Sequence, residues 1–162
     1  MAEKMNNLSG SEWFKNSFSI WSKINKTKEE RQLKHPAMFP QKLPEKLINI
    51  YTRNKGELIL DPFMGIGSTL LASQNCGVRS IGLDLNKNYV SKVKKRVKHF
   101  QKDLFNKKKV YEPKIYCDDA KNISKYVKKE SVDLVITSPP YWNILNQKRT
   151  ADNKEIRKYS ML

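Results

Sequence analysis

Residues 58–68 read Leu58-Ile59-Leu60-Asp61-Pro62-Phe63-Met64-Gly65-Ile66-Gly67-Ser68. The apolar run at its start is typical of a buried strand, and it breaks abruptly into a turn that contains Pro62, Gly65 and Gly67. In an open α/β sheet, ligands bind just outside the carboxyl ends of the strands. The break after Leu60 therefore predicts one wall of a binding site.

A second stretch of the same kind reads Asp133-Leu134-Val135-Ile136-Thr137-Ser138-Pro139-Pro140-Tyr141-Trp142. Here an apolar strand runs into two prolines and two aromatic residues. We expect the two breaks to lie side by side at one edge of the sheet. One break lets the backbone approach a cofactor, and the other is stiff, aromatic and polar. Together they predict an enzyme that brings a small cofactor and a flat substrate edge together.

The remaining sequence alternates between helical and strand patterns. The predicted order is a helix from Pro44 to about Thr52, a strand over Leu58–Leu60, a helix over Ser68–Asn75, a strand over Ser80–Leu83, a helix from Lys87 to about Asn106, a strand over Lys114–Cys117, a helix over Ala120–Lys129 and a strand over Val132–Thr137. This alternation predicts an α/β fold with a three-layer, mostly parallel, Rossmann-like sheet. In the helix that starts at Lys87, one face is apolar. The opposite face is typical of a solvated surface; in the alternative interpretation it helps to hold a phosphate backbone. It carries Lys92, Lys94, Lys95, Arg96, Lys98 and Lys102.

Three regions are expected along the chain. Residues 1–34 form an amino-terminal aromatic and basic arm, residues 35–142 form the main domain, and residues 143–162 form a polar tail that reads as a loop. The aromatic residues of the arm either pack on the domain or contact a nucleobase. These residues are Trp13, Phe14, Phe18 and Trp21.

Composition narrows the class of protein. The 162 residues include 32 Lys+Arg against 16 Asp+Glu, a formal charge of +16 that attracts polyanions. No apolar run approaches the roughly 20 residues needed to span a bilayer, and residues 1–10 lack the apolar core of a signal peptide. Cys76 and Cys117 match neither a zinc site nor a disulfide framework. We therefore expect a reduced, cytoplasmic protein without a metal centre.

The glycine turn has the features of a cofactor site. Gly65 and Gly67 can take backbone angles closed to other residues and leave no Cβ in the way of a ligand. Asp84 ends the next strand 23 positions after Asp61 (84 − 61), near the roughly 20-residue spacing at which an acid reaches ribose hydroxyls. The turn does not match G-x-G-x-x-G, which disfavours a nicotinamide cofactor. Asp61 would repel a pyrophosphate but suits a cationic ligand.

The segment Asp61–Ser68 resembles the S-adenosylmethionine-binding motif of the DNA amino-methyltransferases, DPFxGxGT, with Ser68 in place of the commoner Thr. The resemblance implies S-adenosylmethionine as the cofactor, with Asp61 and the glycine turn at its methionine part and Asp84 at its ribose. It implies that Asp119 lies near the adenine amino group, although the family usually has Gly where Asp118 stands. Residues 35–44 resemble the other cofactor segment of the same family, in which Phe39 lies against the cofactor. The implied cofactor-binding residues are Phe39, Asp61, Pro62, Phe63, Gly65, Gly67, Ser68, Asp84 and Asp119.

Ser138-Pro139-Pro140-Tyr141 has the features of a rigid acceptor for an amino group. Two successive prolines fix φ and donate no backbone hydrogen bond, so the carbonyl of Pro139 is held outward as a free acceptor. The Ser138 hydroxyl is a second acceptor. Two acceptors that converge on one nitrogen suit an exocyclic NH₂, and Tyr141 offers a flat face for a base drawn out of the helix.

The same four residues are similar to the catalytic motif [DNS]-P-P-Y of these methyltransferases. The Ser form followed by Trp142 looks most like the enzymes that methylate cytosine at N4, whereas the Asp form is commoner among adenine-N6 enzymes. The chain has no Pro-Cys pair, which argues against the covalent cytosine-C5 route. The resemblance therefore implies direct methyl transfer to DNA, with no metal, in a restriction-modification setting.

Other functions stay open at this point. The substrate is adenine N6 in DNA or RNA in one alternative, and the amide of a protein glutamine in another. In a third, the chain is a non-catalytic basic module that binds nucleic acid. Relatives continue past the catalytic motif, so we expect the carboxy-terminal strands of the sheet to be absent and the fourth strand to be an edge. The chain would then be half of a split enzyme or a truncated product, and it would need a second polypeptide for activity.

Overall fold

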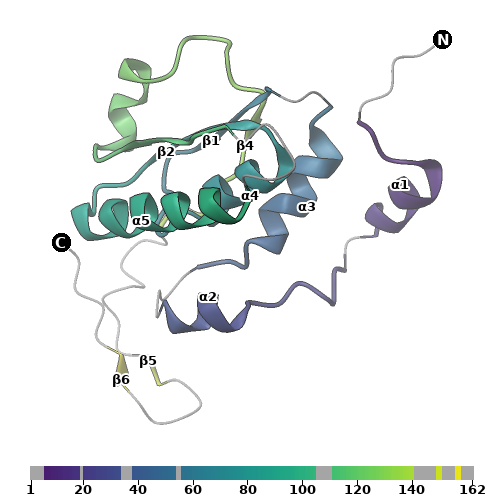
Figure 1. Ribbon diagram of the computed structural model, residues 1–162, viewed down its shortest axis with the longest axis horizontal. Helices are drawn as coiled ribbons and strands as arrows, with labels where there is room; N and C mark the ends of the chain where they lie inside the picture. Colours follow the sequence, from purple (N-terminus) through teal and green to yellow (C-terminus); the bar gives the residue numbers. More distant parts are fainter. Residues whose placement is uncertain are drawn as a thin grey trace.

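A four-stranded parallel sheet forms the centre of the molecule in the computed structural model (Figure 1). The structure describes residues 6–18, 20–33, 38–53, 56–104, 111–140, 149–150 and 156–157, with backbone only for 99–104 and the last two pairs. The strands are β1 (Leu58–Asp61), β2 (Arg79–Leu83), β3 (Lys114–Tyr116) and β4 (Leu134–Val135). Their order is β3-β2-β1-β4, and each neighbouring pair is parallel. The predicted parallel α/β sheet is confirmed.

Three helices cover one face of this sheet: α3 (Lys42–Tyr51), α4 (Ser68–Cys76) and α5 (Lys87–Leu104). Their apolar residues form two buried clusters with the strands, one centred on Leu70 and Val93 and the other on Ile48 and Ile59. These four side chains are fully buried. The apolar face predicted for the helix that starts at Lys87 is therefore confirmed at Val90, Val93 and Val97, which are buried.

The other face of the sheet is covered by the segment that follows β3. Leu58, Leu60, Ile81 and Leu83 point to this face and pack against apolar residues of 123–132. Figure 1 shows this light-green segment on the side of the sheet opposite to α4 and α5. Because both faces are covered, β1 is buried along its whole length. The predicted three-layer arrangement is present.

The segment after β3 differs from the predicted helix over Ala120–Lys129. It forms a 3-10 helix, η1 (Ala120–Lys125), which ends at Tyr126 with an i→i+3 bond from the Tyr126 N–H to the Ile123 carbonyl of 3.0 Å. Asn122 and Tyr126 both donate to the carboxylate of Asp118, and these bonds tie η1 and the residue at its end to the residue that precedes its N-cap.

Strand β4 is also shorter than the predicted Val132–Thr137. At its start, the Asp133 carboxylate accepts a hydrogen bond of 2.7 Å from the Leu58 N–H, so a side chain takes the place of a ladder bond. At its end, the Ile136 N–H still donates to the Leu60 carbonyl at 3.0 Å. Within the described residues β4 pairs only with β1, as expected for an edge strand.

The amino-terminal arm contains two short helices, α1 (Gly10–Asn16) and α2 (Lys28–Gln32). Both begin with a capping box, from Ser9 to Glu12 in α1 and from Thr27 to Glu30 in α2. None of the residues of α1 is buried, and Figure 1 shows it beside α3 and away from the sheet. Trp13, Phe14 and Phe18 are exposed, so packing on the domain, the first of the two alternatives for these aromatics, is wrong for these three.

The described residues of the carboxy-terminal tail form two short strands. The tail, expected to be a loop, contains an antiparallel pair, β5 (Arg149–Thr150) and β6 (Ile156–Arg157). The boundaries expected at 34/35 and 142/143 lie outside the described residues and stay predictions. Among the described helices, none combines the length and the apolar character that crossing a bilayer requires.

Candidate functional site

The carboxyl ends of the four strands surround a cavity of about 240 Å³. The glycine turn after β1 lines one side of it, and Ser138, Pro139 and Pro140 line another. The two sequence breaks therefore share one pocket, as their positions after parallel strands predict. We call this cavity the reaction pocket.

The glycine turn has a backbone that requires glycine at two positions. Gly65 and Gly67 have φ of 51° and 81°, in the left-handed region that other residues rarely adopt. A Cβ on Gly67 would also lie 2.7 Å from a methyl carbon of Val93 in α5. The second glycine thus allows α5 to pack directly against the turn, while the first faces the pocket.

Asp61 ends β1 as a buried carboxylate, only 1% exposed. Its Oδ1 accepts a hydrogen bond of 3.2 Å from the Phe63 N–H. Burial raises the pKa of Asp61 to about 6, because desolvation disfavours the charged form. An acid in such a position is stabilised in its charged form by a nearby cation, which is the kind of ligand that the sequence predicts there.

Asp84 follows β2 and is partly buried at the rim of the pocket. Its Oδ2 accepts from the Gly65 N–H at 2.9 Å, and its Oδ1 accepts from the Asn86 N–H at 2.8 Å. Burial raises the pKa of this carboxyl, and the two N–H groups act in the opposite direction. Each carboxylate oxygen can accept a further hydrogen bond, so Asp84 can receive two hydroxyl groups of a ligand.

A hydrogen bond joins the glycine turn to the segment before α3. The Ser68 hydroxyl donates to the backbone carbonyl of Phe39 at 3.0 Å. Phe39 and Met38 line the reaction pocket from this side. Ser68 and the Thr that is commoner in the motif both carry a hydroxyl group. In this chain, that hydroxyl positions a second wall of the pocket.

Sequence reasoning missed the role of Arg96. The sequence pattern predicts a solvated side chain on the outer face of α5, and this prediction is wrong for Arg96, because its guanidinium donates to the Ile66 carbonyl in the glycine turn. Burial lowers the pKa of Arg96, and the charge of Glu30 acts in the opposite direction. Glu30 itself is buried and accepts from the Gln41 N–H at 2.7 Å. No pattern in the sequence distinguishes Arg96 from the lysines around it.

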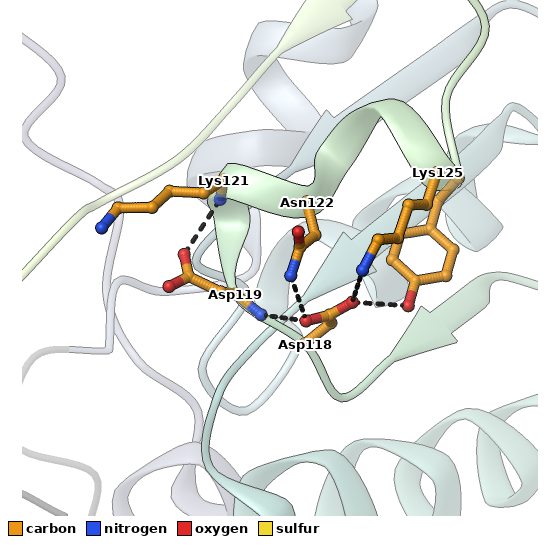
Figure 2. Close-up of polar contacts among 6 residues, drawn as sticks. Asp118, Asp119, Lys121, Asn122 and Lys125 are labelled. Atoms are coloured by element: carbon orange, nitrogen blue, oxygen red, sulfur yellow. Dashed lines mark hydrogen bonds and ion pairs between the residues drawn. The ribbon is translucent and has the colours of Figure 1, made fainter.

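The two acids after β3 have different surroundings, which Figure 2 shows. Asp118 is the centre of a network: its carboxylate accepts from Asn122 Nδ2 at 2.8 Å and from the Tyr126 hydroxyl at 2.7 Å. Its Oδ1 also accepts from the Asp119 N–H at 2.7 Å, and Lys125 Nζ lies 3.8 Å from its Oδ2. These bonds hold the pKa of Asp118 below its usual range, chiefly through the Tyr126 hydroxyl.

Asp119 keeps one oxygen available. Its Oδ1 caps η1 by accepting from the Lys121 N–H at 2.9 Å, and its Oδ2 has no partner in the described part of the chain. Both acids line the reaction pocket. Because Asp118 is occupied by its own chain, Asp119 is the better of the two to accept a ligand amino group.

Ser138 and Pro139 are far from the glycine turn in the sequence, but they line the same cavity. Ser138 is half-buried, and Pro139 and Pro140 are exposed. Neither the Ser138 hydroxyl nor the Pro139 carbonyl takes part in a hydrogen bond among the described residues. Both acceptors are therefore available to a substrate, as the sequence predicts.

Most of the predicted site residues meet at this pocket. Those that line it are Phe39, Pro62, Phe63, Gly65, Ser68, Asp84, Asp119, Ser138, Pro139 and Pro140. Asp61 and Gly67 lie behind it and are buried. Tyr141 lies outside the described residues, so its expected stacking role stays a prediction. No group of three or more His, Cys, Asp or Glu side chains that suits a metal ion occurs in the described residues.

Comparison with known proteins gives the class that this fold and pocket define. The family model for DNA methylases matches residues 2–95, more than half of the chain. The chain belongs to this DNA methylase family, whose model is named for N6 and N4 methyltransferases. The predicted resemblance to the DNA amino-methyltransferases is thereby confirmed.

Individual relatives agree with this assignment. The chain is 37% identical over 79 residues to the type II methyltransferase M2.DpnII of Streptococcus pneumoniae, a match that covers 48% of this chain and 29% of that protein. It is 33% identical over 87 residues to the orphan methyltransferase M.BamHII of Bacillus amyloliquefaciens, covering 51% of this chain and 32% of that protein. The matched segment thus spans about a third or less of these relatives.

A solved structure supports the fold alone. The X-ray structure of YJHP from E. coli aligns with 67% of this chain and 42% of its own, at a TM-score of 0.50 and 18% sequence identity.

Proposed function

We propose that the chain carries the cofactor-binding and catalytic segments of a DNA methyltransferase that uses S-adenosylmethionine and methylates the N4 amino group of cytosine. The observation that carries this proposal is the shared cavity, which Asp84 and Asp119 line together with the available acceptors of Ser138 and Pro139, while Asp61 lies buried behind it. Family membership supports the methylation of DNA amino groups. The choice of cytosine N4 rests on Ser138 together with Trp142.

Two acids that line the pocket and one directly behind it fit the parts of S-adenosylmethionine. Asp61, behind the pocket, is buried with its pKa raised to about 6, so it suits the cationic methionine end. Asp84 can accept the two ribose hydroxyls, and the free Oδ2 of Asp119 suits the adenine amino group. When bound, the cofactor supplies a methyl group on a sulfonium, which an amine can take without a metal.

The other wall of the pocket orients the substrate. The Ser138 hydroxyl and the Pro139 carbonyl accept hydrogen bonds from the two N–H groups of an exocyclic amine, which directs the lone pair of the nitrogen away from them. As the nitrogen attacks, it gains positive charge, and both acceptor dipoles stabilise that charge. Because the prolines hold the carbonyl in place beforehand, little reorganisation accompanies the reaction.

A second polypeptide is part of this proposal. The matched segment spans about a third or less of these relatives, and the part of the chain that lines the reaction pocket includes no region assigned to reading the DNA sequence. We expect this chain to bind cofactor by itself and to transfer methyl groups only with a partner that supplies further strands and reads the DNA sequence.

One assay tests both base and activity. The chain is incubated with S-adenosylmethionine carrying a labelled methyl group and with DNA, with and without candidate partner chains, and the digested nucleosides are analysed by mass. We expect labelled N4-methylcytosine. Labelled N6-methyladenine would overturn the assignment of the base, and full methylation by the chain alone would overturn the need for a partner.

A pair of serine variants tests the mechanism. Ser138→Ala should lower methyl transfer at least 100-fold and leave the affinity for S-adenosylhomocysteine unchanged, since one preorganised transition-state contact is worth roughly 10²–10³ in rate. Ser91→Ala, at an exposed position of α5, is the matched control. Equal activity of the two variants would remove Ser138 from the mechanism. If no methyl group is transferred by any variant, even with a partner present, a non-catalytic module that binds nucleic acid is favoured.

A further inference from the structure

A second cavity lies between the amino-terminal arm and the outer side of α3. Its volume is about 960 Å³, and it is lined by described residues of the arm between Asn7 and Ile24, by α3 and the residues that follow it, and by Cys76 and Val78. We call it the arm cleft. We propose that the arm cleft holds the phosphate backbone of the DNA next to the reacting base; this inference rests on the proposed function.

The arm is fixed to α3 at both ends, which leaves the cleft between. At the carboxyl end of α3, Asn6 Nδ2 donates to the Ile50 carbonyl and Asn7 Nδ2 to the Arg53 carbonyl, both at 2.6 Å. At the amino end, Glu30 of α2 accepts from the Gln41 N–H at 2.7 Å. The arm between these anchors passes alongside α3 (Figure 1). The cleft is therefore preformed rather than made on binding.

The charge of the cleft selects a polyanion. Five cationic side chains line it against two carboxylates, Glu12 and Glu45. Both carboxylates are engaged within the chain: Glu12 Oε2 accepts from Ser9, and Glu45 Oε1 accepts from Gln41 at 3.0 Å and from Asn75. The cations that line the cleft are Lys15, Lys23, Lys42, Lys46 and Arg53.

Three lysines of the cleft form no ion pair with a carboxylate of the described residues. In the described part of the chain, no carboxylate lies within ion-pair distance of Lys15, Lys23 or Lys42. Lys46 Nζ lies 4.4 Å from the ring centre of Trp21, a cation–π contact that leaves its charge in place. A row of such cations is the chemistry that binds successive phosphates.

The cleft also presents apolar side chains to its occupant. Phe18 is 55% exposed and packs edge to face with Phe14 at 5.2 Å, and Ile20 is 85% exposed. An exposed aromatic ring beside lysines binds an unpaired base together with its phosphate, because every base has a flat face that stacks. This combination favours nucleic acid over an acidic peptide.

The position of the cleft connects it to the reaction pocket. Met38 and Phe39 line the reaction pocket, and Lys42 and Lys46, which follow in the same segment, line the arm cleft. A DNA strand with one base in the reaction pocket would therefore meet Lys42 and Lys46 first, because these two lysines follow the wall of that pocket in the chain. The cleft would then hold the strand while the base is drawn out.

Two charge-reversal pairs test the proposal. Lys15→Glu/Lys23→Glu is compared with Lys94→Glu/Lys95→Glu on the exposed face of α5, which changes the net charge equally. Binding to a fluorescent DNA oligonucleotide is measured by anisotropy from low to high salt. We expect the arm pair to weaken binding at least tenfold and to lower the slope of log K against log salt by about 2, one unit per lost phosphate contact. The α5 pair should leave the slope unchanged.

Phe18→Ala tests the stacking contact, with Tyr51→Ala as a control at another exposed aromatic residue. We expect about a tenfold loss of affinity for single-stranded DNA from the first change and none from the second. Equal effects of the two charge pairs on affinity and slope would overturn the arm cleft. Binding of the unchanged chain to anionic lipid vesicles but not to DNA would overturn it as well.

The affinity for S-adenosylhomocysteine, measured by calorimetry, separates this inference from the proposed function. The arm variants should bind it like the unchanged chain, which also shows that they are folded. If DNA is methylated but the arm pair binds DNA normally, the cleft fails and the function stands. If the arm pair loses DNA binding but no methyl group is ever transferred, the cleft stands and the function fails.

Discussion

The backbone N–H of Gly65 donates a hydrogen bond of 2.9 Å to Oδ2 of Asp84, and this bond joins the turn after β1 to the end of β2. A second bond between the same regions runs from the Met64 N–H to the Leu83 carbonyl at 2.9 Å. The carboxylate that we expect to bind the ribose thus also fixes the turn that we expect to bind the methionine part. Changes at Asp84 should affect both.

Asp84→Asn should lower the affinity for S-adenosylhomocysteine at least tenfold. The amide keeps the shape of the side chain, but its nitrogen cannot accept, so either the Gly65 N–H or a ribose hydroxyl loses its partner. Isothermal titration calorimetry measures the effect. Glu130→Gln, at an exposed position, is the control and should bind normally. An unchanged affinity in Asp84→Asn would remove this residue from the site.

The contribution of Asp61 to the stability of the free protein should fall as the pH rises from about 4 to about 6. The pKa of Asp61 is raised from its usual value of 3.8 to about 6 in the folded state, so the folded state binds the proton more tightly than the unfolded state. Its contribution is therefore most favourable below about 4 and is lost as Asp61 ionises. Urea unfolding across this range, compared with Asp61→Asn, isolates the contribution. A difference between the two proteins that does not change with pH would contradict it.

Binding of S-adenosylmethionine should release a proton from Asp61 near pH 6. A cation beside this carboxylate lowers its pKa, so affinity should rise with pH through about 6 and level off above. Calorimetry in two buffers of different ionisation enthalpy counts the protons released. Asp61→Asn should bind more weakly and release none, whereas equal proton release by both would assign the effect elsewhere.

Gly67→Ala should destabilise the fold by about 2–5 kcal/mol, from a left-handed backbone and from overpacking against Val93. Gly10→Ala is the matched control, because a Cβ on Gly10 meets nothing within 4 Å. Chemical denaturation of both variants measures the difference. Adding Val93→Ala should recover part of the loss by removing the clash but not the backbone strain. Equal stability of the two glycine variants would show that the turn adapts.

Asp118→Ala should weaken cofactor binding through Asp119, since it removes the acceptor of the Asp119 N–H and of two side chains on η1. The loss should be smaller for a cofactor analogue without the adenine amino group. Lys125→Ala, which removes only a 61% exposed partner at 3.8 Å, should be nearly neutral. Equal losses for both ligands would indicate a general structural effect instead.

The elements that the sequence predicts well are those with strong local signals. The apolar run Leu58–Leu60 before the glycine turn specifies a buried strand. The apolar repeat of the Lys87 helix specifies a helix and its buried face. The pocket was predictable because parallel strands place their carboxyl ends at one edge. Motif positions that lie after β1, β2 and the end of β4 therefore meet without any knowledge of side-chain contacts.

Long-range side-chain bonds account for most of what sequence reasoning missed. Arg96 reads as one more solvated cation, yet it holds the Ile66 carbonyl in the turn. Asp118 reads as a departure from the usual glycine, yet its carboxylate accepts from Asn122 within η1 and from Tyr126 at the end of η1. Both depend on where distant backbone atoms come to lie, which periodicity does not report.

The bond from the Ser68 hydroxyl to the Phe39 carbonyl ties one wall of the pocket to the docking of α3. Phe39 lies just before α3 and Ser68 begins α4, so the bond is kept only while α3 is packed on α4. A bound nucleoside would slow hydrogen exchange of the α3 amides most, because release of that helix opens its binding place.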